Sequence, residues 1–131
     1  APINLEWGYD NRTTGLRVPR SGPNNRRVEN RLIGADTNPY LAIAGSLAAG
    51  LLGIRHKVEP REHVVGNGFE GGRALPYSLL EGLEAFTKSE DLADVLGQKF
   101  IDMYAALKFE EYDAFMQVIS PWERQHLLLN V

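Results

Sequence analysis

The stretch Arg27-Val28-Glu29-Asn30-Arg31 decides the fold, because it has the alternation of a β-strand and concentrates charge on one side of it. In a strand, successive side chains point to opposite faces, so Arg27, Glu29 and Arg31 share a face with about 6.6 Å between neighbours. A carboxylate between two guanidinium groups can hold a divalent cation while the arginines bind phosphate or carboxylate oxygens. The same spacing suits a charge ladder that neutralises itself, and the pattern alone leaves both interpretations open.

Length and composition indicate one globular domain. The chain has 131 residues, of which 44% are hydrophobic and 24% are charged, as is ordinary for a folded protein with a single core. It has no cysteine, which excludes a disulfide scaffold or a thiolate metal site and suits a reducing compartment. Because the sequence does not open on a secretory signal, we expect a cytoplasmic protein.

Charge is distributed unevenly along the chain, whose net charge is −3. Residues 1–31 contain six arginines and three acids, whereas residues 81–113 contain three lysines and nine acids. The basic end has no lysine and no regular alternation of basic and aromatic residues, so it suits small anions better than nucleic acid. The acidic segment is typical of a solvated helix face. We therefore expect no nucleic-acid partner.

Two N-terminal strands are predicted to carry the site. Residues 11–19 and 26–32 have the alternation of strands, and residues 21–25 between them are rich in glycine, proline and asparagine. The two segments should therefore pair as an antiparallel, hairpin-like unit.

The rest of the chain is predicted to be helical, apart from a long loop over residues 55–76. Asn38-Pro39 is a typical helix start, and residues 40–54 are apolar nearly all round, which predicts a buried helix. That run is shorter than the roughly twenty residues of a membrane span, so no membrane is expected. Capping patterns at Ser78 and Ser120, with apolar residues at helical spacing, predict a C-terminal group of helices. The fold class is therefore α+β.

The loop glycines and the histidines do not predict a site. Val65-Gly66-Asn67-Gly68 lacks the Gly-Lys-Ser/Thr ending of a phosphate loop, so these glycines are assigned to turns. His56, His63 and His126 lack metal-ligand spacing, and surface or structural roles are favoured for them.

Three ordered motifs lie within residues 11–42. They are Asn11-Arg12-Thr13-Thr14-Gly15-Leu16-Arg17-Val18-Pro19, Arg26-Arg27-Val28-Glu29-Asn30-Arg31 and Asn38-Pro39-Tyr40-Leu41-Ala42. Together they resemble the C-terminal part of the glutamine synthetase family. The resemblance continues through Ser120-Pro121-Trp122-Glu123-Arg124, so it covers essentially the whole chain. Residues 34–40 and the Ser-Pro-Trp-Glu segment look more like the glutamate–polyamine branch, of the γ-glutamylputrescine synthetase kind, than like ordinary bacterial glutamine synthetases.

The resemblance implies an ATP-dependent ligase of nitrogen or polyamine metabolism. In that family ATP phosphorylates the side-chain carboxylate of glutamate, and ammonia or an amine then displaces phosphate from the acyl phosphate. The implied cofactor is Mg²⁺ or Mn²⁺, with ATP as co-substrate, and the implied assembly is a homo-oligomeric ring.

By position, the resemblance also implies roles for five residues. Glu29 would be a ligand of the metal that bridges the ATP phosphates, and Arg31 would bind glutamate or its acyl phosphate. Arg12 would lie between nucleotide and glutamate and contact both, so that Arg12 and Arg31 would be the catalytic pair. Arg17 and Arg27 would contact nucleotide phosphates. Arginine suits such roles because it stays charged and binds oxygens bidentately, and phosphoryl transfer depends on positioned cations.

Two departures from the family bear on what the chain does alone. Asn24 stands where bacterial glutamine synthetases usually have lysine, which leaves one phosphate contact without its usual side chain. The chain is also much shorter than the family, so residues 1–131 are expected to be the C-terminal portion of a catalytic domain. Because one glutamate cannot hold Mg²⁺, the isolated fragment is predicted to be inactive. The alternative is a non-catalytic relative or interaction module that retains only the fold. Nothing in the sequence indicates the amine acceptor.

Overall fold

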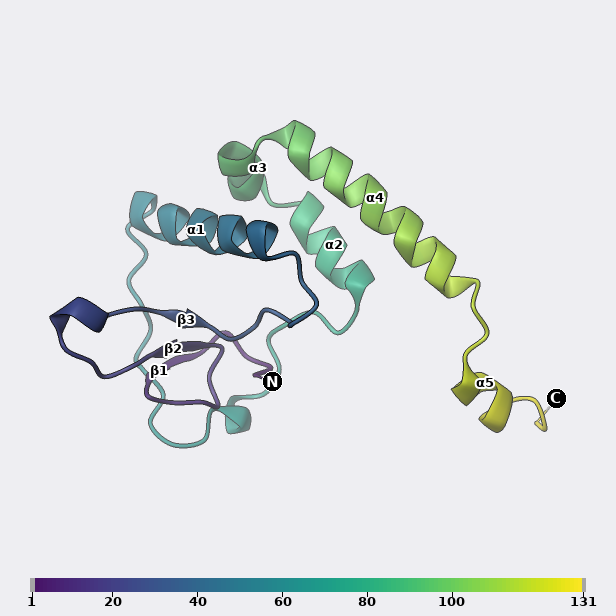
Figure 1. Ribbon diagram of the computed structural model, residues 1–131, viewed down its shortest axis with the longest axis horizontal. Coiled ribbons are helices and arrows are strands. Elements are labelled where there is room, and N and C mark those ends of the chain that lie inside the picture. The colour runs from purple at the N-terminus through teal and green to yellow at the C-terminus, as the bar shows by residue number, and fades with distance from the viewer. Residues whose placement is uncertain (1, 131) are drawn as a thin grey trace. The chain divides into compact units, whose positions relative to one another are not determined.

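The computed structural model describes residues 2–130, which form a small sheet followed by helices, so the predicted α+β class is confirmed (Figure 1). The strands are β1 (Trp7–Tyr9), β2 (Leu16–Val18) and β3 (Glu29–Asn30). The helices are α1 (Pro39–Arg55), α2 (Leu79–Thr87), α3 (Glu90–Leu96), α4 (Gln98–Met116) and α5 (Pro121–His126). Short 3-10 helices, Pro23–Asn25 and Gly68–Gly71, lie in the connections. The chain divides into one unit that ends at Leu75 and a second that begins at Pro76.

β2 is the central strand of the first unit. It pairs antiparallel with β3, with Leu16 opposite Asn30 and Arg17 opposite Glu29, which confirms the predicted antiparallel pair. Both strands are shorter than the predicted segments 11–19 and 26–32. The sequence pattern did not predict β1, which pairs parallel with β2 on its other side.

A turn replaces the beginning of the predicted first strand. Asn11 Oδ1 accepts hydrogen bonds from the backbone N–H and the hydroxyl of Thr13 at 2.9 and 2.6 Å. The hydroxyl of Thr14 lies 3.0 Å from the backbone oxygen of Asn11. Asparagine and threonine side chains compete in this way with strand hydrogen bonding and favour turns. The strand therefore begins only at Leu16.

Gly15→Ala is expected to destabilise the first unit by about 1–3 kcal/mol, as overpacking of a tight site does. A Cβ at Gly15 would lie 2.4 Å from the backbone oxygen of Asn4 and 2.8 Å from Leu32 Cδ2, and a backbone oxygen cannot swing away. Gly22→Ala is the matched control, because a Cβ there would meet no atom within 4 Å. Urea unfolding measures both variants, and equal stabilities would contradict the close approach at Gly15.

Helix α1 begins where the sequence predicts. Asn38 Oδ1 accepts a hydrogen bond from the backbone N–H of Tyr40 at 3.0 Å, and Pro39 occupies the first turn, where its missing N–H costs nothing. The helix is tied to the sheet by Asn30 of β3, whose Nδ2 donates to Ser46 Oγ at 3.1 Å. Local capping therefore sets where the helix starts, and a polar contact places it over the sheet.

The expected burial of α1 is wrong for the described chain. Within residues 2–130, Ala48 is the only residue of α1 that is buried, whereas Tyr40, Leu47 and Ile54 are 82%, 70% and 78% exposed. The helix is apolar nearly all round, and the described residues bury only a small part of that surface. None of the helices in the described part of the chain is long and apolar enough to cross a membrane.

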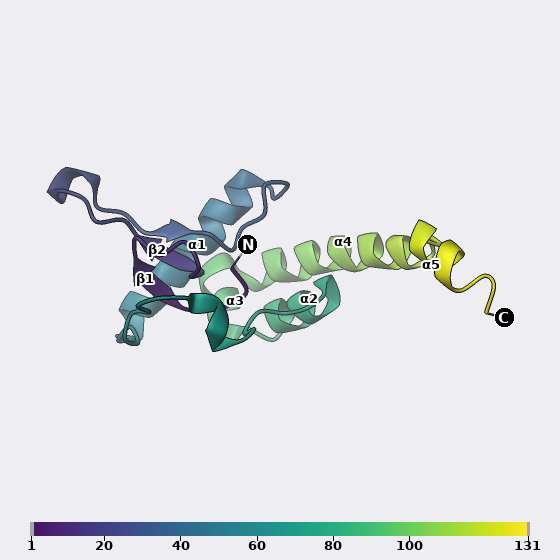
Figure 2. The ribbon, with the colours of Figure 1, turned by 90° about the horizontal axis from the view of Figure 1, so that it is seen from below.

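In the second unit, α2 packs alongside α4 around a small apolar core (Figure 2). Leu83 and Ile101 are buried, and the rings of Phe86 and Tyr104 meet edge to face with centroids 5.7 Å apart. Residues 90–116 do not form one continuous helix, because Gly97, with φ of 88°, separates α3 from α4. Such a φ favours glycine, so the glycine at position 97 determines where the helix breaks.

The predicted capping boxes are confirmed at one of the two sites. At α5, the backbone N–H of Ser120 donates to Glu123 Oε2 at 2.7 Å, and Ser120 Oγ accepts from the Glu123 N–H at 3.1 Å. At α2, Ser78 Oγ accepts from the N–H of Glu81 at 3.2 Å, but the Glu81 carboxylate accepts from Tyr77 instead of Ser78. The second box is therefore only half formed.

Candidate functional site

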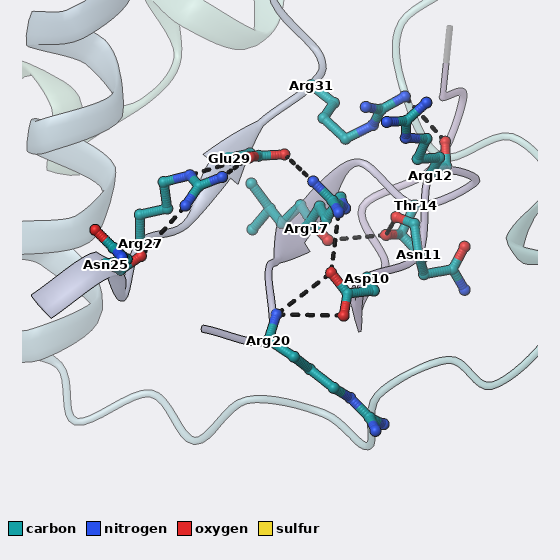
Figure 3. A network of polar contacts seen from close by, with 11 residues as sticks. Asp10, Asn11, Arg12, Thr14, Arg17, Arg20, Asn25, Arg27, Glu29 and Arg31 are labelled. Carbon is teal, nitrogen blue, oxygen red and sulfur yellow. Dashed lines mark hydrogen bonds and ion pairs between the residues drawn. The ribbon is translucent and has the colours of Figure 1, made fainter. Parts of the chain in front are cut away.

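Glu29 lies between two arginines at the sheet (Figure 3). Arg17 and Glu29 are partners in the register of β2 and β3, and Arg17 Nη1 lies 2.8 Å from Glu29 Oε2. Arg27 places Nη2 at 2.9 Å and Nε at 3.1 Å from Glu29 Oε1. Each carboxylate oxygen thus accepts from a guanidinium group. The self-neutralising arrangement is present, with Arg17 from the neighbouring strand in the place expected for Arg31.

These contacts stabilise the charged forms of both groups. The hydrogen bond from Arg17 is the main reason that the pKa of Glu29 is lowered, and Arg27 adds to it while partial burial opposes it. The hydrogen bond to Glu29 is likewise the main reason that the pKa of Arg17 is raised. Arg17 also pairs with Asp10 at 2.9 Å. Glu29 therefore remains ionised at an acidity that protonates an ordinary glutamate.

The stability of the first unit is expected to fall at acid pH through the protonation of Glu29. Because folding lowers the pKa of Glu29, its contribution is complete above the unfolded-state pKa and is lost as the pH falls through the lower folded-state value. Glu29→Gln should therefore flatten the pH dependence of the unfolding free energy below about pH 5.

Thermal unfolding from about pH 7 down to about pH 3 tests this expectation. The matched control is Glu62→Gln, which removes an exposed carboxylate that joins none of the ion pairs in the described chain. The control should keep the wild-type pH dependence. A Glu29→Gln profile parallel to that of the wild type would show that the ion pairs do not stabilise the sheet.

Arg12 and Arg31 are cations without an acid partner among residues 2–130. β3 ends at Asn30, and Arg31 does not share Glu29 with Arg27 as expected, because its Nη2 donates to the backbone oxygen of Arg12 at 3.0 Å. In the view of Figure 3, Arg12 and Arg31 lie on the opposite side of Arg17 from Arg27. Within the described residues neither guanidinium joins an ion pair, and Arg31 Nε is buried without a hydrogen-bond partner. These donors suit phosphate or carboxylate oxygens.

Two open hollows with basic linings lie beside this cluster. The larger has a volume of about 730 Å³ and is lined in part by Arg20, Arg26 and Arg27. The smaller has a volume of about 300 Å³, and Arg12, Arg20 and His63 contribute to its lining. Neither Arg20 nor Arg26 is among the residues for which the sequence motifs imply a role, although the excess of arginine in residues 1–31 is a signal for both.

The aromatic residues of β1 support the smaller hollow. His63 packs against the rings of Trp7 and Tyr9, with centroids 5.6 and 5.2 Å apart, so it has the structural role that was favoured for it. The guanidinium of Arg20 lies over the Tyr9 ring at 5.7 Å, a cation–π distance. These residues were missed because β1 itself was not predicted.

The described residues do not make a complete divalent-cation site. Among residues 2–130 there is no group of three or more Asp, Glu, His or Cys side chains that could hold a metal ion. Both oxygens of Glu29 are engaged by Arg17 and Arg27. Mg²⁺ requires near-octahedral coordination by oxygen, and one carboxylate does not supply it. The chain by itself therefore does not fit a bound metal.

Arginines gathered at a small sheet, beside open hollows, suit anionic ligands such as those of phosphoryl-transfer enzymes. The catalytic domain of glutamine synthetase matches residues 1–127, and the chain belongs to that family.

Two curated relatives and one solved structure show the extent of the similarity. The chain is 40% identical over 124 residues to the glutamate–isopropylamine ligase of Pseudomonas sp, which covers 92% of the chain and 27% of that protein. It is 37% identical over 130 residues to the gamma-glutamylputrescine synthetase PuuA of Escherichia coli strain K12, covering 98% and 28%. The structure of apo GmaS without ligand matches with a TM-score of 0.83 and 33% identity, covering 97% of the chain and 30% of that one. The chain thus spans less than a third of the length of these proteins.

Proposed function

We propose that residues 1–131 are the C-terminal portion of the catalytic domain of an ATP-dependent ligase. The enzyme would join glutamate to ammonia or an amine through a γ-glutamyl phosphate, with cleavage of ATP to ADP and phosphate. Two of the relatives are named for isopropylamine and putrescine. These two amines and ammonia are therefore the first acceptors to test.

The observation that carries this proposal is the pair Arg12 and Arg31. Within the described residues these cations have no acid partner, while the neighbouring Arg17, Arg27 and Glu29 neutralise one another. A buried guanidinium N–H without a partner costs free energy until an acceptor satisfies it, and both Arg31 Nε and Arg17 Nε are in this state within the described chain. An anionic substrate would supply that acceptor.

The proposed roles follow from where charge moves during the reaction. Arg31 binds the side-chain carboxylate of glutamate and then the acyl phosphate. Arg12 lies between nucleotide and glutamate and stabilises the negative charge that spreads over the transferred phosphoryl oxygens. Arg17 and Arg27 contact the nucleotide phosphates, and their hydrogen bonds to Glu29 hold both guanidinium groups in fixed orientations.

Glu29 is proposed as one ligand of Mg²⁺ or Mn²⁺, with the other ligands outside residues 1–131. When bound, the cation would offset the charge of the ATP phosphates. Asn24, at the usual lysine position, is exposed in the 3-10 helix Pro23–Asn25 and would provide no cationic phosphate contact. The complete enzyme is further proposed to form a homo-oligomeric ring and to lie in the cytoplasm. No nucleic-acid or membrane partner is proposed for it.

The complete polypeptide that contains these residues tests the proposed function. It is incubated with ATP, Mg²⁺ and glutamate, and with ammonia, isopropylamine or putrescine in turn. Phosphate release that depends on the acceptor, together with the matching γ-glutamyl amide in mass spectra, is the expected result. If no acceptor yields an amide, the ligase assignment fails. In that case the complete polypeptide is titrated with Mg-ATP in a calorimeter. A protein that also does not bind Mg-ATP is a non-catalytic relative.

The isolated 131-residue chain is expected to form no γ-glutamyl amide under conditions in which the complete polypeptide is active. The reason is that the described residues provide one carboxylate and no group of metal ligands. The measurement is the same mass-spectrometric assay at equal protein concentrations. Amide formation above the protein-free control would contradict this expectation.

A further inference from the structure

Asn4 is a buried asparagine that joins separate segments of the backbone. Its exposure is 1%, and its Nδ2 donates to the backbone oxygens of Gly68 at 2.7 Å and Thr13 at 3.4 Å. Its Oδ1 accepts from the backbone N–H groups of Glu6 at 3.1 Å and Gly15 at 3.3 Å. Both donors and both acceptor positions of the amide are therefore used, which fixes its orientation.

The backbone that Asn4 holds also carries Arg12 and Arg31, which have no acid partner in the part of the chain that the structure describes. Thr13 directly follows Arg12, and the backbone oxygen of Gly15 accepts from the N–H of Arg31 at 2.9 Å. Arg31 then reaches back, because its Nη2 donates to the backbone oxygen of Arg12. A shift of residues 13–15 would thus move the supports of both guanidinium groups at once.

The loop on the far side of Asn4 is fixed to the same turn by further contacts. The N–H of Gly68 donates to Thr13 Oγ1 at 2.7 Å, and Asn11 Nδ2 donates to the backbone oxygens of Val64 and Gly66 at 3.3 and 2.9 Å. The fit is close, because a Cβ at Gly68 would lie 2.9 Å from the backbone oxygen of Thr13. The turn therefore rests on a loop that cannot approach it further.

We propose that Asn4 is a positioning residue, which sets where Arg12 and Arg31 meet the transferred phosphoryl group. This inference rests on the proposed ligase function. Asn4 acts through the backbone of residues 13–15 and not by contact with a substrate. Displacement of a catalytic group by about 1 Å can cost about 10²-fold in rate. Because Arg12 acts on charge that develops in the transition state, its displacement lowers kcat. Displacement of Arg31, the proposed glutamate ligand, raises the KM for glutamate, whereas the KM for ATP changes little because Arg17 and Arg27 keep their contacts to Glu29.

Asn4→Asp in the complete polypeptide tests the proposal. The change keeps the shape and the acceptor oxygen, but it removes both donated hydrogen bonds and sets a carboxylate oxygen against the carbonyl oxygens of Thr13 and Gly68. Asn67→Asp is the matched control, because this exposed asparagine caps the 3-10 helix by accepting from Phe69, which aspartate also does. The change loses only a long, exposed hydrogen bond from Asn67 Nδ2 to Glu70 Oε1, at 3.4 Å. We expect Asn4→Asp to lower kcat about 10–100-fold and to raise the KM for glutamate, with the KM for ATP nearly unchanged, and Asn67→Asp to retain wild-type kinetics.

A second pair of variants displaces the turn from the loop side without burying a charge. Gly68→Ala inserts a Cβ 2.9 Å from the backbone oxygen of Thr13, whereas Gly71→Ala, at the other end of the same 3-10 helix, meets no atom within 4 Å. Gly68→Ala should lower kcat about tenfold, and Gly71→Ala should leave it unchanged. This pair decides the question if Asn4→Asp does not fold.

The outcomes separate the proposal from the function on which it rests. A wild-type protein that forms no amide overturns the ligase function itself. With an active wild type, an unchanged kcat in both test variants overturns the positioning role, and so does a loss that matches the unfolded fraction seen by circular dichroism. Amide hydrogen exchange gives a readout besides activity. The N–H groups of Gly15 and Arg31 should exchange faster in Asn4→Asp than in Asn67→Asp, and equal rates would overturn the proposal.

Discussion

Arg12→Ala is expected to lower the kcat of the complete enzyme by about 10²–10³-fold, the loss that removal of one transition-state donor causes. The proposed role of Arg12 is to stabilise charge on the phosphoryl group as it moves from nucleotide to glutamate. Its guanidinium joins no ion pair within the described residues, so truncation removes a catalytic cation and not a structural one. Thermal unfolding should therefore be unchanged while steady-state phosphate release falls.

Two further variants identify which property of Arg12 matters. Arg12→Lys keeps the positive charge but loses the planar fork, so it should recover only part of the lost rate. Arg124→Ala removes an exposed arginine from the end of α5 and is expected to keep the wild-type rate. If Arg12→Ala and Arg124→Ala behave alike, Arg12 takes no part in the transfer step.

Glu29→Gln is expected to raise the Mg²⁺ concentration required for half-maximal activity by about 10–100-fold, the loss that even outer partners of a metal site cause. The proposed role of Glu29 is that of a ligand, and glutamine has almost the same shape without the charge. The same change also leaves Arg17 and Arg27 without their shared carboxylate. A Mg²⁺ titration of ligase activity at saturating ATP and glutamate measures the shift.

Asp10→Asn separates the two effects of the Glu29 substitution. Asp10 is the other acid that pairs with Arg17, at 2.9 Å, and its replacement removes an ion pair but leaves the Glu29 carboxylate in place. We expect a much smaller change in the Mg²⁺ requirement than Glu29→Gln produces. Similar shifts in the two variants would assign Glu29 to the orientation of Arg17 and remove it from the metal site.

The helix starts could be predicted because capping is local. Asn38 caps α1 through atoms of its own turn, and Ser120 with Glu123 caps α5 in the same way. The predicted helix over residues 40–54 differs from the observed α1, Pro39–Arg55, by one residue at each end. Interactions over three or four residues are visible in a sequence, so these elements required no knowledge of the fold.

The partners of Glu29 could not be predicted in full, because strand register decides them. The side chain opposite Glu29 across the sheet is that of Arg17, twelve residues away in sequence, and cross-strand neighbours lie about 4.5–5.5 Å apart. That is closer than the roughly 6.6 Å to Arg31 along the strand. The nearer arginine pairs with the carboxylate, and Arg31 is left for the backbone of Arg12.

The sequence by itself determined that this chain is α+β, that Arg27 lies close enough to Glu29 to pair with it, and where α1 and α5 begin. These features rest on residue type and on neighbours within a few positions. Only the tertiary structure decided that β1 joins the sheet, that α1 keeps an exposed apolar side, and that Arg12 and Arg31 have no acid partner among the described residues. Each of these depends on contacts between residues far apart in the chain, because burial and charge pairing are properties of the folded surface and not of any one segment.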